Sequence, residues 1–191
     1  MDHHDHVALL RPGITEPGGT WADFGSGAGA FTLALADLLG PGARIVSVDL
    51  DASALREQPR AVRERFPGVA LEQRVADFRG PLELPPLDGL VMANSLHFVG
   101  RAEQEAVVRG LSGHLRPGGR FLLVEYDTDR GRPWVPYPLA YPSWERLASA
   151  AGLADTTLIG RVPSRWLGAI YSAASTAAGA PITATAPATG G

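Results

Sequence analysis

Short apolar runs alternate with longer amphipathic stretches along most of the chain. The apolar runs have the length of strands and lie at residues 20–24, 44–49, 69–76, 87–93 and 120–126. Stretches with helical spacing separate them, at residues 30–39, from Asp51 or Ser53 to about Phe66, and at residues 101–115. Strands and helices in alternation predict a mostly parallel sheet that is covered by helices on both faces.

The two ends of the chain depart from this alternation. Residues 6–13 (HVALLRPG) predict a short helix ahead of the first strand, ended by Pro12 and Gly13. After a predicted helix at residues 143–151, two strand-like runs at 155–159 and 165–172 are separated by a short turn. That spacing predicts an antiparallel hairpin at one edge of the sheet. We therefore predict an α/β three-layer sandwich with a mostly parallel seven-stranded sheet and an antiparallel C-terminal edge hairpin.

The same pattern predicts a single folded domain. Residues 1–18 form an N-terminal segment with a short helix, and residues 19–172 form the folded domain. The segment GPLELPP, between the third and fourth strands, is too short and too rich in Pro for a good helix. From residue 173 to residue 191 the chain is of low complexity and has little to bury, which predicts a disordered tail.

Composition narrows the class of protein and of partner. The chain has 191 residues and a formal net charge of −3, and all 17 basic residues are Arg. This charge argues against nucleic acid as a partner. The chain has no Cys, which excludes disulfides, thiolate metal sites and cysteine nucleophiles. The N-terminus does not resemble a signal peptide, and no apolar run approaches the ~20 residues of a membrane span. We expect a cytoplasmic protein with no membrane partner.

The stretch DFGSGAGAF, residues 23–31, fits two cofactor patterns. Gly25, Gly27 and Ala30 fit the dinucleotide pattern G-x-G-x-x-G/A. Asp23 with Gly25, Gly27 and Gly29 fits D-x-G-x-G-x-G, a pattern of proteins that bind S-adenosylmethionine (SAM). In both cases the glycines let the cofactor approach the backbone, and Asp49 at the end of the second strand is placed to bind a ribose.

Two further acids favour SAM over a dinucleotide. Asp23 would repel a pyrophosphate at this turn, whereas SAM carries a cationic sulfonium and an ammonium there. Asp77 follows the third strand and can accept a hydrogen bond from an adenine amino group, with Phe78 or Leu50 against the ring. As structural alternatives, Asp49 could cap a helix and Asp77 could be a turn residue.

Six segments in a fixed order carry a resemblance to a known family. They are WADFGSGAGAFT, IVSVDLD, RVADF, LDGLVMANSLHFV, LRPGGRFLLVEY and RWLGAIYSA, and they span residues 21–173. Together they resemble class I SAM-dependent methyltransferases that act on small molecules, which implies a Rossmann-like fold and SAM as cofactor. The expected cofactor-binding residues are Asp23, Gly25, Ser26, Gly27, Asp49, Leu50, Asp77, Phe78 and Asn94. Asn94 would lie beside the methionine part, although an Asn after a strand also suits a left-handed turn.

Methyl transfer sets modest demands on catalytic residues. The protein must align acceptor, methyl and sulfur, and a base is needed only if the acceptor must lose a proton. His97 is the first candidate and Tyr126 the second, because they follow the fourth and fifth strands, whose carboxyl ends face the site. Glu125 and Asp127 share that position. The alternative for His97 is a buried histidine with a structural hydrogen bond.

The acceptor pocket has to be built from few segments, because no cap domain is inserted in the chain. Trp134, Tyr137 and Tyr141, on a loop rich in Pro, are predicted to form a lid or wall that favours a flat or apolar acceptor. The alternative is that these rings only pack the loop onto the sheet. Because no cap domain is inserted, we expect a pocket that is shallow, shared in a homodimer, or suited to a larger acceptor. We expect no metal at the cluster of residues 3–6 (HHDH), which lies at a terminus.

The sequence thus favours a SAM-dependent methyltransferase acting on an O, N or C atom of a small molecule. Two alternatives stay open at this point. One is an NAD(P)-dependent oxidoreductase that uses the dinucleotide pattern. The other is a binding module that keeps the SAM fold without catalysis.

Overall fold

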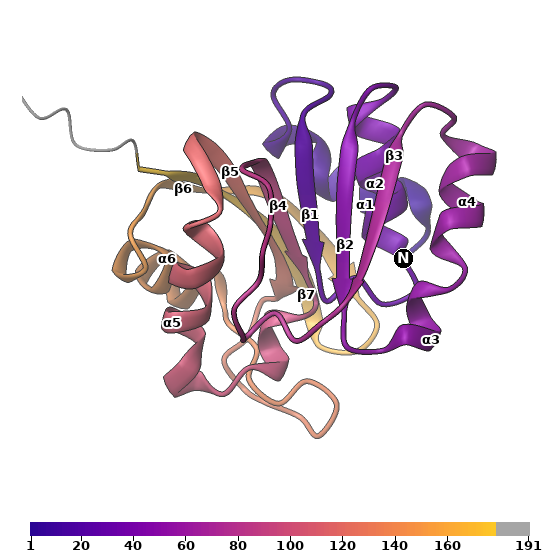
Figure 1. Ribbon diagram of the computed structural model, residues 1–191. Coiled ribbons are helices and arrows are strands. Elements are labelled where there is room, and N and C mark those ends of the chain that lie inside the picture. The colour runs from indigo at the N-terminus through magenta and orange to yellow at the C-terminus, as the bar shows by residue number, and fades with distance from the viewer. Residues whose placement is uncertain (179–191) are drawn as a thin grey trace, which may run out of the picture.

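A computed structural model of the chain describes residues 1–178 (Figure 1). Its helices are α1 (His3–Leu10), α2 (Ala30–Leu39), α3 (Ala52–Leu55), α4 (Gln58–Arg65), α5 (Arg101–Ser112) and α6 (Tyr141–Ala150), with 3-10 turns η1 (Arg11–Gly13) and η2 (Leu96–Phe98). Its strands are β1 (Thr20–Phe24), β2 (Arg44–Asp49), β3 (Ala70–Val75), β4 (Leu87–Ala93), β5 (Leu115–Tyr126), β6 (Leu153–Ser164) and β7 (Gly168–Ala177).

The strands form one sheet of seven in the order β3-β2-β1-β4-β5-β7-β6. Strands β1 to β5 pair in parallel, while β7 runs antiparallel to both β5 and β6. This arrangement confirms the predicted fold class, including the antiparallel hairpin at one edge. The chain reverses direction along the sheet between β1 and β4, so the carboxyl ends of these two strands open onto a crevice.

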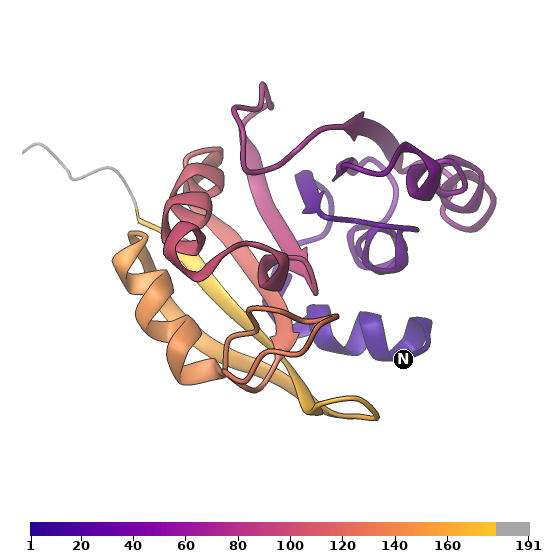
Figure 2. The ribbon, with the colours of Figure 1, turned by 90° about the horizontal axis from the view of Figure 1, so that it is seen from below.

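Helices cover the sheet on both faces (Figures 1 and 2). On one face, α5 and α6 pack on Phe24, Met92 and Phe121 through Val108 and Trp144. On the opposite face, α1 and α2 bury a second cluster that includes Leu10, Leu35, Ile45, Val91 and Leu122. Strand residues alternate between the two clusters, as expected of strands that are buried on both faces.

Several element boundaries differ from the sequence prediction. Helix α1 begins at His3 rather than His6, and β6 runs from Leu153 to Ser164 rather than over residues 155–159 only. The single helix expected from Asp51 or Ser53 to Phe66 is divided into α3 and α4, because Pro59 has no N–H to donate to the preceding turn. Strand β5 begins at Leu115 rather than Arg120, since the register against β4 shifts between Leu87 and Gly89 and the intervening residues form a bulge. As expected, no helix joins β3 to β4.

The predicted start of the tail at residue 173 is wrong. Strand β7 continues to Ala177, and Ala173, Ala174 and Ser175 are fully buried between β5 and β6. In a sequence, small side chains give little sign of a buried core. Here they fit a strand that lies inside the sheet and is packed on both faces. Residues 179–191, where the rest of the predicted tail falls, lie outside the described residues.

The N-terminal segment is a helix docked on α2. Asp2 caps α1 by accepting a hydrogen bond from the Asp5 amide, and His3 contacts Asp37 of α2 at 2.9 Å. The His6 ring packs on Phe31 of the same helix. Among residues 1–178, no three His, Asp or Glu side chains come together as a metal site. In the same range no helix is long and apolar enough to cross a membrane.

Candidate active site

The glycine turn after β1 crosses the carboxyl end of the sheet. The Gly25 amide donates to the Val48 carbonyl of β2 at 2.8 Å, which fixes the turn against the neighbouring strand. Gly25 has a φ of +72°, and a Cβ there would clash with Ser95. Gly27 has a φ of +52°, and a Cβ there would meet no atom within 4 Å. The turn is therefore tight beneath Gly25 and open above Gly27, so a ligand can approach its backbone.

Asp49, at the end of β2, is tied into this turn. One carboxylate oxygen accepts from the Gly27 amide at 2.7 Å, and the other accepts from the Asp51 amide at 2.9 Å. Asp49 is thus held in place by two backbone donors and keeps further lone pairs for hydroxyl donors. It is Asp51, not Asp49, whose side chain caps α3.

Asp23 lies buried beneath the turn. Its Oδ2 accepts from the Thr32 hydroxyl at 2.7 Å, while its Oδ1 is buried and has no hydrogen-bond partner among the described residues. Burial, together with the nearby charge of Asp49, raises the pKa of Asp23 from 3.8 to about 7. A buried carboxyl with an unpartnered oxygen, next to a second acid, strongly favours a positively charged ligand nearby.

A cavity of about 310 Å³ opens beside the turn. It is lined by Gly25, Asp49, Leu50, Asp77, Phe78, Arg79, Asn94, Ser95, Phe98 and Val99. Six of the nine predicted cofactor residues are thus brought together, whereas Asp23, Ser26 and Gly27 lie in or under the turn and do not line it. Sequence reasoning missed Arg79, Ser95, Phe98 and Val99 as lining residues, although the last three lie within the NSLHFV segment that it singled out.

Asp77 is engaged by a neighbour inside this cavity wall. The Arg79 guanidinium contacts both of its carboxylate oxygens, at 2.6 and 3.0 Å, and the Arg79 amide also donates to it. These contacts hold the pKa of Asp77 below its usual range. The charge of Asp77 is therefore compensated by Arg79. Fewer of its lone pairs are free to accept from an adenine than the sequence implied.

Asn94 combines the two roles that the sequence left open. It has a left-handed backbone with φ +52°, as expected of an Asn that ends a strand. Its backbone amide donates to the Val124 carbonyl at 2.9 Å, which holds the residue at the junction of β4 and β5. The side-chain Oδ1 is nevertheless buried without a partner among the described residues, which is costly unless a ligand donor meets it.

His97 forms a buried pair with Glu125. Its Nδ1 lies 2.9 Å from both carboxylate oxygens, and both side chains are almost fully buried. Since an ionised carboxylate only accepts hydrogen bonds, Nδ1 is the donor toward Glu125, and in a neutral imidazole this leaves Nε2 with its lone pair. The structural hydrogen bond and a role as proton acceptor are thus compatible in His97. Glu125 was considered only for its position, and no sequence signal pairs it with His97.

Tyr126 lies close to this pair and is a poor base. Its ring centroid is 6.0 Å from that of His97. Burial and the charge of Glu125 raise the pKa of the Tyr126 phenol above its ordinary value. The phenol therefore stays protonated at neutral pH, where it can donate a hydrogen bond but cannot remove a proton.

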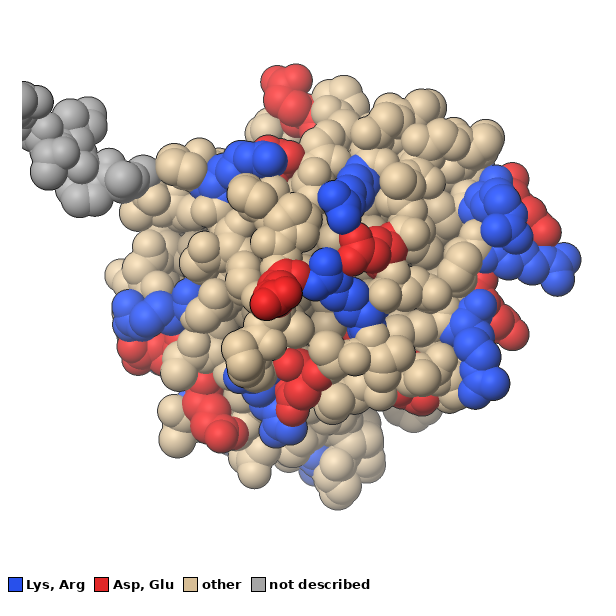
Figure 3. All heavy atoms as spheres, viewed as in Figure 1, with Lys and Arg blue, Asp and Glu red and all other residues tan. Residues whose placement is uncertain are grey.

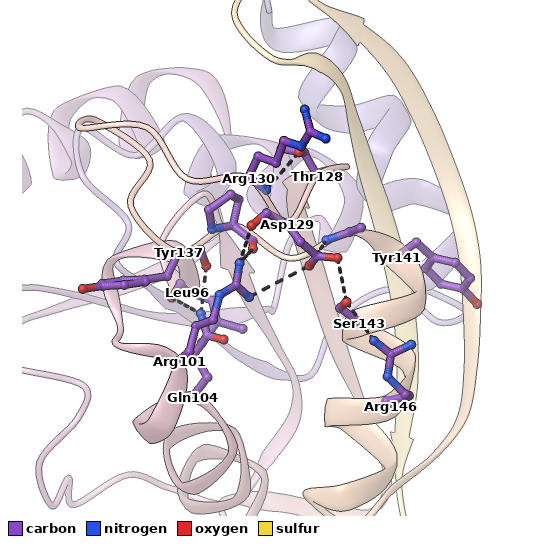
Figure 4. Close-up of polar contacts among 12 residues, drawn as sticks. Leu96, Arg101, Gln104, Thr128, Asp129, Arg130, Tyr137, Tyr141, Ser143 and Arg146 are labelled. Atoms are coloured by element: carbon purple, nitrogen blue, oxygen red, sulfur yellow. Dashed lines mark hydrogen bonds and ion pairs between the residues drawn. The ribbon is translucent and has the colours of Figure 1, made fainter.

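The loop after β5 is held by a cluster around Asp129 (Figure 4). Asp129 accepts from the Ala140 amide and the Ser143 hydroxyl, and Arg101 lies 3.9 Å away. Tyr137 and Tyr141 point to opposite sides of this cluster (Figure 4).

The three predicted pocket rings do not share one site. The Tyr141 ring packs edge-on against Tyr171 of β7, with centroids 5.8 Å apart, so it packs the loop onto the sheet. Tyr137 is fixed by its backbone, whose amide donates to the His97 carbonyl at 3.0 Å. Trp134 lines a second cavity together with Tyr126 and Trp166, and neither Tyr137 nor Tyr141 lines it.

Strand order and the turn define the class of protein. A parallel sheet with an antiparallel β7 inserted before β6, and a glycine turn backed by buried carboxylates, is the fold of class I SAM-dependent methyltransferases. The chain belongs to the methyltransferase domain family, whose family model matches residues 22–121. No protein of curated function matches the sequence.

Solved structures agree on the fold. YcgJ from Bacillus subtilis aligns with a TM-score of 0.72 at 15% identity, over 93% of this chain and 100% of that one. The 1,6-didemethyltoxoflavin-N1-methyltransferase of Burkholderia thailandensis, solved with S-adenosylhomocysteine (SAH), aligns with a TM-score of 0.71 at 18% identity, over 92% and 78%. The N-methyltransferase NodS of Bradyrhizobium japonicum, also solved with SAH, gives 0.69 and 19%, over 91% and 86%.

Proposed function

We propose that this methyltransferase transfers the methyl group of SAM to a small-molecule acceptor, with His97 as general base when the acceptor must lose a proton. The observation that carries the proposal is the buried His97–Glu125 pair, whose histidine contacts Phe98 in the wall of the cavity at the ends of β1 and β4. Two of the similar structures are methyltransferases that were solved with SAH, and one of them also holds its small-molecule substrate.

The residues around the cavity fit SAM. Asp49 would bind the ribose hydroxyls, Phe78 and Leu50 would lie against the adenine, and Asn94 would meet a donor of the methionine part with its unpartnered oxygen. Asp23 does not line the cavity, so we assign it an effect through its charge rather than a direct contact. When bound, SAM supplies an electrophilic methyl group on a cationic sulfur that leaves as a neutral thioether.

The same residues disfavour a dinucleotide. A pyrophosphate needs free amides at the glycine turn, but the Gly27 amide already donates to Asp49. Asp23 and Asp49 beneath the turn would also repel it. These contacts leave the NAD(P)-dependent oxidoreductase without support.

The chain's own part in the reaction is to orient the acceptor and accept its proton. Glu125 fixes the orientation of the His97 ring and stabilises the imidazolium that forms when Nε2 takes a proton. The buried surroundings of the pair exclude water. Phe98, 4.4 Å from the His97 ring by centroids and part of the cavity wall, links the base to the cofactor site.

Two experiments test the proposal. Calorimetry should detect binding of SAM and SAH but not NAD, and tight NAD binding without SAM binding would refute the cofactor. Incubation with methyl-labelled SAM and a panel of small hydroxyl, amine and carbon acceptors should then release SAH. Cofactor binding with no turnover on any acceptor would favour the non-catalytic binding module.

For the base, His97→Gln should lower kcat on a hydroxyl acceptor by about 10²–10⁴-fold while SAH still binds. His114→Gln is a matched control, because His114 lies ahead of β5 and lines neither the cavity beside the turn nor the second cavity. Equal turnover of His97→Gln and the control across the pH range would show that the enzyme works by positioning alone.

The cytoplasmic location and a homodimer stay predictions. Basic and acidic side chains are interspersed on the face drawn in Figure 3, which is in keeping with an acceptor that is not a polyanion.

A further inference from the structure

Three aromatic side chains line a second cavity of about 300 Å³. They are Tyr126 at the end of β5, Trp134 on the following loop, and Trp166 in the turn between β6 and β7. Trp134 is 57% exposed and Trp166 is 72% exposed. Two large apolar rings kept in solvent around one cavity are not explained by the two core clusters, and such exposed apolar groups mark binding sites.

Trp134 is presented by a loop that is itself well anchored. The next residue, Val135, is buried and pairs with Arg132 through two backbone hydrogen bonds. The loop is also fixed at Tyr137 through the His97 carbonyl. The backbone that carries the indole is therefore well anchored, although more than half of the Trp134 surface stays exposed.

Trp166 belongs to a turn that is tied to the same loop. Its amide donates to the Ser164 hydroxyl at 3.2 Å, which shapes the turn. Arg161 of β6 forms an ion pair with Asp127, the first residue after β5, at 2.6 Å. This ion pair connects β6, the strand that leads into the turn of Trp166, to the segment that carries Trp134.

Tyr126 connects the second cavity with the base, although His97 itself does not line that cavity. Tyr126 is shared between them, since its ring lines the cavity and lies 6.0 Å from the His97 ring. On its other side His97 contacts Phe98, which lines the cofactor cavity. A molecule held between the two tryptophans would thus contact Tyr126, whose ring neighbours the residue that is to take its proton.

We propose that Trp166, Trp134 and Tyr126 form the acceptor subsite, and that it takes a flat aromatic ring bearing a hydroxyl group. This inference rests on the proposed function and names its acceptor class. Three rings from three segments favour a planar aromatic occupant, because aromatic groups gain from offset and edge-to-face contacts beyond the burial of area. A hydroxyl fits His97, because it loses its proton on methylation and Nε2 of His97 can accept that proton.

The test compares two ligands of similar size and different shape. Calorimetry on the full chain saturated with SAH should show that 2-naphthol, which is flat, binds about tenfold tighter than decahydro-2-naphthol, which is not. Trp166→Ala and Trp134→Ala should each weaken 2-naphthol binding by about tenfold. Trp166→Phe, which keeps a ring, should stay within about threefold of the wild type.

Two controls make the result specific. Leu158→Ala removes an exposed apolar side chain of β6 that does not line the second cavity, and it should leave 2-naphthol binding unchanged. SAH affinity should be the same in all variants, which also shows that they are folded. If the wild-type chain fails to bind SAH, the proposed function itself is refuted, and the acceptor subsite with it.

Other outcomes overturn the subsite alone. One is normal SAH binding with no preference for the flat ligand, or with equal 2-naphthol affinity in Trp166→Ala and the wild type. Another is a dimer by sedimentation that becomes a monomer in Trp166→Ala while 2-naphthol affinity is retained. The tryptophans would then be a self-association surface.

Discussion

Replacing Asp23 by Asn should stabilise the unliganded protein, and more so as the pH rises. The reason is the buried carboxyl, whose pKa is raised from 3.8 to about 7 by burial and by the charge of Asp49. Between these values the unfolded chain has lost the Asp23 proton while the folded chain keeps it. The free energy of unfolding therefore falls with rising pH from about 4 to about 7, and above pH 7 the loss is complete.

The size of the effect follows from the shift. A difference of about 3 pH units at about 1.4 kcal/mol each corresponds to about 4 kcal/mol. Asn has the shape of the protonated carboxyl and can still accept from the Thr32 hydroxyl, but it cannot ionise. Asp23→Asn and the wild type should thus be nearly equal at pH 4 and differ by about 4 kcal/mol at pH 8.

Urea unfolding of both proteins between pH 4 and pH 9 measures this difference directly. Thr32→Val is the companion variant, because it removes the hydroxyl that stabilises the charged carboxylate and should move the transition to higher pH. A difference between Asp23→Asn and the wild type that does not change with pH would refute the reasoning. Asp23→Asn should also weaken binding of cationic SAM more than that of SAH, whose sulfur is neutral.

Three further predictions concern the turn and the cavity. Asp49→Ala should lower SAH affinity in calorimetry by at least about tenfold. Asp77→Ala should lower it less, because Arg79 already forms an ion pair with Asp77. Equal losses in the two variants would contradict this ranking. Gly25→Ala should cost about 2–3 kcal/mol in urea unfolding, since it adds a clash to an unfavourable φ, whereas Gly27→Ala should cost about 1 kcal/mol but impair SAH binding. Glu125→Gln should lower kcat and shift its pH profile without altering SAH affinity, and an unshifted profile would contradict a positioning role.

The sequence was sufficient for most of the fold. Parallel strands buried on both faces are continuous apolar runs, as in β2 and β4, and their periodicity is visible without a structure. Strand β7 was cut short because Ala and Ser carry little hydrophobic signal. Their burial depends on β5 and β6 on either side, which is a property of the tertiary structure.

The candidate site, like the fold, was only partly predictable from the sequence. Side chains that follow parallel strands must meet at one edge, so Gly25, Asp49, Asp77 and Asn94 could be grouped from the sequence. The pairing of His97 with Glu125 joins residues far apart in the chain and leaves no local pattern. The convergence of Trp166 with Trp134 depends on how a hairpin and a loop are folded over the sheet, and on the Asp127–Arg161 ion pair that connects them.

The anchoring of the loop around Asp129 also has a kinetic consequence. Ala140, Ser143 and Arg101 hold this loop, so its conformational entropy is lost when the chain folds and not when a ligand arrives. A binding surface that is already ordered needs no slow rearrangement after encounter. Acceptor association should accordingly appear as a single fast phase in stopped-flow traces, with a rate that rises linearly with acceptor concentration.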